Sequence, residues 1–134
     1  MQRYYDELAR YQRDGFEIIV DKSYEDLNPR DCFDDTVTDI DEICRKIDSY
    51  DLDWFMLRVR VMLDGHELGS HYLGGCLYEN AKDVLTDGTA EDCIYAAMEE
   101  AKQEARRLIG SLSKVVDKLE EDQYNTDSIH YFGA

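Results

Sequence analysis

The segment that decides the fold is WFMLRVRVML at residues 54–63, followed by Asp64 and Gly65. Its odd positions hold Phe, Leu, Val, Val and Leu, whereas its even positions hold Trp, Met, Arg, Arg and Met. This alternation is typical of a strand with one buried face. Asp-Gly favours a type I′ turn, because both central residues of that turn need a positive φ. The segment predicts a hairpin over 54–75 with these residues buried: Phe55, Leu57, Val59, Val61 and Leu68.

Pairing Leu63 with His66 across this turn predicts the register of the whole hairpin. It places Val61 opposite Leu68, Leu57 opposite Tyr72 and Phe55 opposite Gly74 on the apolar face. On the other face, the same register places Arg58 opposite His71.

The N-terminal half predicts one more strand and two short helices. Residues 16–21 alternate in strand fashion, since Phe16, Ile18 and Val20 share a face after the break at Asp14-Gly15. Tyr4, Leu8 and Tyr11 recur at helical spacing and predict an N-terminal helix. A second, amphipathic helix is expected to begin near Thr36 or Thr38, with an apolar stripe made of these residues: Val37, Ile40, Ile43, Cys44 and Ile47.

The C-terminal part has the strongest helical pattern. From Thr89 the apolar positions step by four and three without a break, which predicts a helix over about 89–119 and a loose tail over 120–134. Such a helix outlasts any strand of the hairpin, so its end is expected to overhang the sheet. Either the helix bends at Gly110-Ser111, or its exposed seam pairs with a second copy of the chain. The seam residues are Leu108, Leu112, Val115 and Leu119.

Together these elements predict a single α+β domain over residues 1–134. Its sheet would have three antiparallel strands, 16–21, 54–63 and 66–75, with helices packed on one face and a long C-terminal helix. The length of 134 residues and a hydrophobic content of 43% suit one domain with one core.

The charge is strongly negative and unevenly distributed. The chain has 31 Asp and Glu against 15 Lys and Arg, a net charge of −16. Residues 21–53 carry twelve acidic and four basic residues, a net −8, whereas residues 54–78 carry two of each sign. This balance disfavours nucleic acid or anionic lipid as a direct ligand and favours a basic partner. With no apolar run of about 18 to 20 residues and no signal-peptide core, a cytoplasmic protein is expected.

Nothing in the sequence spells out an active site, a cofactor site or a metal site. The acidic segment 31–53 lacks the glycine and the ligand spacing of a calcium loop. The four cysteines, Cys32, Cys44, Cys76 and Cys93, lack zinc-binding spacing and are expected to be buried free thiols. The best catalytic constellation is His71 with Arg58 and Cys76, and it lacks an orienting partner. A small enzyme is therefore the third choice, and a non-enzymatic protein is expected.

The acidic segment itself is the candidate site. It concentrates nine carboxylates in 23 residues. Acidic helices and loops of this density can imitate the phosphates of duplex DNA, which offers about one negative charge per 1.7 Å. The alternative is a solvated face that keeps the protein soluble. The residues are Asp31, Asp34, Asp35, Asp39, Asp41, Glu42, Asp48, Asp51 and Asp53.

The string DWFMLRVRVMLDGHELGSHYLGGCLYEN at residues 53–80 resembles a pattern found in small, acidic, uncharacterised proteins of tailed phages and prophages. The resemblance implies a phage-encoded protein that acts in the host cytoplasm as an anti-CRISPR or other anti-defence protein. It implies as partner the basic nucleic-acid-binding surface of a host protein or nucleoprotein complex, occupied by a DNA mimic. A phage structural, assembly or regulatory protein that uses the helix seam is the alternative.

Overall fold

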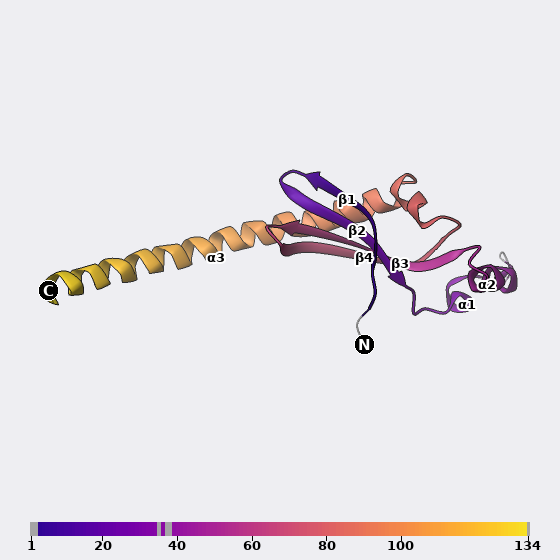
Figure 1. The fold of residues 1–134 in the computed structure, drawn as a ribbon, viewed down its shortest axis with the longest axis horizontal. Coiled ribbons are helices and arrows are strands. Elements are labelled where there is room, and N and C mark those ends of the chain that lie inside the picture. Colours follow the sequence, from indigo (N-terminus) through magenta and orange to yellow (C-terminus); the bar gives the residue numbers. More distant parts are fainter. Residues whose placement is uncertain (1–2, 35, 37–38, 134) are drawn as a thin grey trace.

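The computed structural model describes residues 3–34, 36 and 39–133, and it has an antiparallel sheet with one long helix across it (Figure 1). The sheet has four strands in chain order: β1 (Asp6–Arg13), β2 (Phe16–Tyr24), β3 (Asp53–Leu63) and β4 (His66–Tyr78). Two short helices, α1 (Pro29–Cys32) and α2 (Ile40–Asp48), lie between β2 and β3. The 3-10 helix η1 (Ala81–Leu85) and the helix α3 (Thr89–Gly133) follow β4. The α+β class is confirmed, but the expected number of three strands is wrong.

The additional strand is β1, where the sequence predicted a helix. β1 joins β2 through Asp14 and Gly15, whose φ angles of 51° and 85° suit a type I′ turn. A bulge between Glu7 and Ala9 adds one residue to the strand. Because of this extra residue, Leu8 and Tyr11 are three positions apart, as on one face of a helix, although both belong to a strand. The predicted N-terminal helix is therefore wrong.

The hairpin of β3 and β4 is confirmed, with Asp64 and Gly65 in its turn at φ of 50° and 80°. Phe55, Leu57, Val59 and Val61 are buried as expected, whereas Leu68 is half-buried. The predicted register fails beyond Glu67, because an irregularity after Val61 shifts the pairing by one residue. The observed pairs beyond this point are Val61 with Gly69, Val59 with His71, Arg58 with Tyr72, Leu57 with Leu73 and, after a second irregularity, Phe55 with Cys76.

Helix α3 covers the apolar face of the sheet with small side chains. Its buried residues include Ala97 and Ala101, both fully inaccessible, and they lie against β4. The backbone of Gly69 approaches α3 so closely that a Cβ atom there would lie 2.3 Å from the Ala97 carbonyl oxygen. A glycine is therefore required at this crossing for steric reasons.

Beyond the sheet, α3 continues as one uninterrupted helix through Gly110 to Gly133. The bend considered at Gly110-Ser111 is absent, and the segment 120–133, expected as a loose tail, is helical.

We call residues 108–122 the overhang, because Figure 1 shows this part of α3 extending away from the sheet. Within the part of the chain that the structure describes, no helix has the length and apolar character needed to cross a bilayer.

The opposite face of the sheet carries a cluster of Asp21, Arg58 and Tyr5. The Asp21 side chain, only 2% exposed, accepts two hydrogen bonds from Arg58, at 2.7 Å and 2.6 Å. The guanidinium carbon of Arg58 lies 3.4 Å from the centre of the Tyr5 ring. Burial lowers the pKa of Arg58, but its hydrogen bonds to Asp21 and the charge of that carboxylate outweigh burial and raise the pKa overall. The buried carboxylate is thus paired and hydrogen-bonded.

The crossing at Gly69 leads to a stability prediction. Gly69→Ala should lower the free energy of unfolding by at least about 2 kcal/mol, because the added methyl group would overlap the α3 backbone. Gly110→Ala is the matched control: nothing lies within 4 Å of its Cβ position. It should stabilise the helix by up to about 1 kcal/mol. Urea unfolding followed by circular dichroism measures both, and a Gly69→Ala protein as stable as wild type would contradict the described crossing.

Candidate partner-binding surfaces

The acidic segment forms a lobe at one end of the molecule, beyond the end of the sheet (Figure 1). We define the acidic lobe as residues 29–53, which include α1, α2 and the loops around them. It holds nine acidic and three basic residues, a net charge of −6. The apolar face of α2 contributes one buried residue, Ile40. The lobe is thus mostly surface.

Trp54, the second residue of β3, ties the lobe to the sheet. Its indole nitrogen donates a hydrogen bond to the Leu27 carbonyl oxygen at 2.9 Å, and its ring lies 5.8 Å from the ring of Phe33. Gly75, at φ of 67°, also lies close to the indole ring, since a Cβ atom there would be 3.4 Å from Trp54. The Glu25 carboxylate accepts a hydrogen bond from the Gly75 backbone nitrogen at 2.7 Å. The base of the lobe is therefore fixed by specific contacts.

Several lobe carboxylates have a local structural role. Asp39 caps α2 by accepting a hydrogen bond from the Glu42 backbone nitrogen, and Asp34 accepts two from Thr36. The Thr36 backbone and side chain hold the pKa of Asp34 below its usual value. The remaining local contacts are Asp41 with Arg30, Glu42 with Lys46, Asp51 with the Ser49 hydroxyl, and Asp53 with Lys22.

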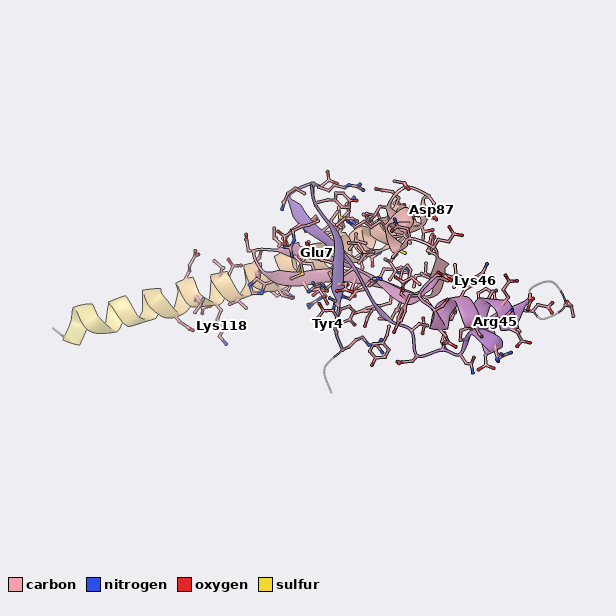
Figure 2. All side chains as sticks on the ribbon, turned by 45° about the vertical axis from the view of Figure 1, so that its right-hand side comes forward. Tyr4, Glu7, Arg45, Lys46, Asp87 and Lys118 are labelled. Atoms are coloured by element: carbon pink, nitrogen blue, oxygen red, sulfur yellow. The ribbon has the colours of Figure 1, made fainter. Side chains whose placement is uncertain are left out.

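These contacts leave the lobe carboxylates in water. Among the described residues of the predicted site, all except the half-buried Asp53 are exposed, and Asp35 lies outside the described residues. Arg45 and Lys46, at the end of α2, interrupt the acidic surface (Figure 2). The exposed carboxylates are Asp31, Asp34, Asp39, Asp41, Glu42, Asp48 and Asp51. The structure thus brings together eight of the nine predicted site residues on one lobe.

The candidate catalytic constellation is not assembled. Arg58 lies on the charged face of the sheet with Asp21, whereas His71 pairs with Val59 and so belongs to the opposite face. The register shift beyond Glu67 causes this separation. Cys76 is buried in the core, and burial raises the pKa of its thiol to about 11. At neutral pH this thiol is protonated and a poor nucleophile.

The other cysteines correct the expectation of four buried thiols. Cys93 is buried, Cys44 is half-buried and Cys32 is exposed, and all of them are free. Within residues 3–34, 36 and 39–133, no cluster of three or more His, Cys, Asp or Glu side chains could hold a metal ion.

The overhang carries the second candidate surface. Its seam residues Leu112, Val115 and Leu119 are exposed, Leu108 is half-buried, and Ile109 and Val116 add exposed apolar area beside them. Figure 2 shows Lys118 on this part of α3, away from the sheet. The heptad spacing predicted an apolar stripe on this part of the helix, and its pairing with a second copy stays a prediction.

Two structurally important groups were missed by the sequence reasoning. The Asp21, Arg58 and Tyr5 cluster depends on the pairing of β2 with β3, which alternation alone does not reveal. The role of Trp54 depends on the path of the chain after β2.

In the comparisons with known proteins, no family model, curated protein or solved structure matches this chain.

The burial of Cys76 and Cys93 predicts a reactivity pattern. At pH 8 a thiol-specific reagent should modify Cys32 rapidly, because it is exposed. Cys76 should react at least about a hundredfold more slowly, since its thiolate is scarce far below its pKa. Timed labelling followed by mass spectrometry measures this order, with urea-unfolded protein as the control in which all four react. Rapid labelling of Cys76 in the folded protein would contradict its burial and restore it as a candidate nucleophile.

Proposed function

We propose that this protein is a non-enzymatic binding protein whose acidic lobe occupies a basic, nucleic-acid-binding surface of another protein. The observation that carries the proposal is the gathering of seven exposed carboxylates on a lobe outside the sheet core. The core strands β3 and β4 are nearly neutral. The lobe carries −6 of the net charge of −16, and residues 79–104 carry another −6. What distinguishes the lobe is that its carboxylates stand outside the sheet core, at one end of the molecule (Figure 1).

The local contacts of these carboxylates are compatible with phosphate mimicry. A capping or surface-paired carboxylate that stays exposed keeps its negative charge available to a partner, and an exposed ion pair is worth little in stability. The anchoring by Trp54 supports the proposal as well, because a held charge array loses less conformational freedom on binding.

The resemblance of residues 53–80 to small phage and prophage proteins suggests where such a partner is found. Host defence complexes, including CRISPR complexes, present basic channels that bind nucleic acid. An acidic protein covering such a channel would compete with its nucleic acid. We therefore propose an anti-defence role, with the target class taken from that resemblance.

A second candidate function is assembly through the overhang. The observation that favours it is the continuous exposed apolar seam on α3. In that case the acidity serves only solubility, and neutralising the lobe leaves binding unchanged.

A capture experiment with two charge-matched variants tests the first proposal. The lobe variant carries Asp39→Asn, Asp41→Asn, Glu42→Gln and Asp48→Asn; Asn also caps helices, so α2 should remain folded. The control variant makes the same charge change outside the lobe with Asp14→Asn, Asp92→Asn, Glu99→Gln and Glu100→Gln. All three immobilised proteins are exposed to nuclease-treated bacterial lysate, and the retained proteins are identified.

Wild type and control should retain the same nucleic-acid-binding proteins, and an added DNA duplex should release them. The lobe variant should bind a captured protein with an association rate lower by roughly tenfold or more at low salt, because electrostatic steering is lost. Equal binding by the lobe variant and wild type, or partners that DNA fails to displace, would refute the mimicry and leave the acidity as a solubility device.

A further inference from the structure

The two outer strands of the sheet differ in how their edges are protected. The strand order leaves one side of β1 and one side of β4 without a neighbouring strand, and such an edge offers backbone N–H and C=O groups to another extended chain. β1 has four charged residues among eight and contacts η1. β4 has thirteen residues, no proline and, apart from its histidines, one charged residue, Glu67. The β4 edge therefore lacks the charges that usually block strand addition.

The middle of β4 is a regular strand. Between its two irregularities, residues 69–73 pair in continuous antiparallel register with residues 57–61 of β3. In such a pairing every second residue directs its N–H and C=O groups away from the partner strand. Tyr72 is 50% exposed on the face that carries Arg58, and Leu73 is 38% exposed on the face that α3 covers. A strand added to this edge would cover apolar surface on both faces.

Helix α3 forms one wall of a groove along the same edge. The groove has a volume of about 360 Å³. It is lined by residues 67–69 of β4 and by Glu100, Gln103, Glu104 and Arg107 of α3. Because side chains alternate between the two faces of a strand, every second side chain of an added strand would point towards this groove.

The groove is acidic. Arg107 donates hydrogen bonds to the Glu104 carboxylate at 2.5 Å and 3.0 Å, so these two charges compensate each other. Glu67 and Glu100 also line the groove, and neither forms an ion pair or a side-chain hydrogen bond with any residue that the structure describes. Two uncompensated carboxylates beside a free edge favour a strand with basic side chains.

A second copy of β4 suits this edge less well. Pairing two copies through residues 69–73 would bring their α3 helices side by side on the same face of a continuous sheet. Residues 89–104 of α3 carry five acidic residues and one basic residue. The two helices would therefore repel each other, whereas a basic segment would be attracted.

We propose that the β4 edge binds an extended, basic segment of a partner protein by strand addition. Backbone hydrogen bonds to residues 69–73 supply affinity, and the flanking side chains supply specificity. Glu67 and Glu100 select a Lys or Arg that faces α3, and Tyr72 and Leu73 select apolar residues nearer the other end of the segment. This surface is separate from the acidic lobe, so the inference does not rest on the proposed function.

A synthetic probe tests the backbone pairing. The probe is the acetylated peptide Thr-Val-Thr-Lys-Thr-Lys-Thr, in which valine and both lysines share one face when the chain is extended. The control peptide has the same sequence with every backbone nitrogen methylated, so it keeps the charge but cannot pair as a strand. At physiological salt the control should bind at least about tenfold more weakly in calorimetry. Equal binding of the two peptides, or no binding of the probe at about millimolar concentration, would overturn the proposal.

Two charge-matched protein variants test the groove. Glu67→Gln with Glu100→Gln should weaken binding of the probe at least about fivefold, because the carboxylates that attract its lysines are lost. Asp92→Asn with Glu99→Gln removes the same charge outside the groove lining and should bind the probe as wild type does. A groove variant that binds like its control would contradict the assigned role of the two glutamates.

Hydrogen exchange locates the added strand. The probe should slow amide exchange in residues 69–73 and leave residues 29–52 unchanged. Slower exchange in residues 29–52 alone would show that the probe binds the acidic lobe, and would overturn the proposal for β4. Protection of residues 69–73 that grows with protein concentration in the absence of the probe would show a second copy at this edge instead.

Discussion

The close approach of α3 to β4 at Gly69 is the constraint on which the rest of the structure depends. The sheet has one apolar face, and the alanines of α3 lie on it at a distance that excludes even a methyl group on Gly69. The link from β4 to α3 through η1 is short, so the helix must return across the sheet. Because the helix has 45 residues and the longest strand has 13, its second half must leave the sheet behind. The overhang is therefore a consequence of how the core is closed.

The same arrangement separates the chain into regions with different physical tasks. The strands β3 and β4 are nearly neutral, and the buried charge Asp21 is paired with Arg58. The acidic lobe is attached at the opposite end of the sheet from the overhang, through Trp54 and its contacts with Leu27 and Phe33 (Figure 1). Charge repulsion among the lobe carboxylates is thus kept away from the core. The acidic lobe and the overhang are therefore two separate surfaces at opposite ends of the sheet (Figure 1).

The sequence predicted those features of the fold that are set by residues close together in the chain. Alternation over 54–63, the Asp64-Gly65 turn and the heptad spacing of α3 predicted the hairpin, its buried face and the overhang. The bulges in β1 and β4 could not be predicted, because each depends on how a neighbouring strand or helix packs. One bulge made β1 look helical, although Asp14-Gly15 repeats the hairpin signal of Asp64-Gly65. The bulge in β4 places His71 on the opposite face of the sheet from Arg58, so the predicted catalytic residues do not come together. The acidic lobe was predicted by charge alone, but its anchoring by Trp54 needed the fold.

The central claim is that the acidic lobe is the surface that meets a partner, while the sheet and α3 provide its frame. Hydrogen exchange with mass spectrometry, on the protein alone and saturated with a captured nucleic-acid-binding partner, tests this claim most directly. We expect amides in residues 29–52 to exchange more slowly in the complex, with the rates in β2 and β3 unchanged. Protection confined to α3 or to the charged face of the sheet, with residues 29–52 exchanging as in the free protein, would contradict the account.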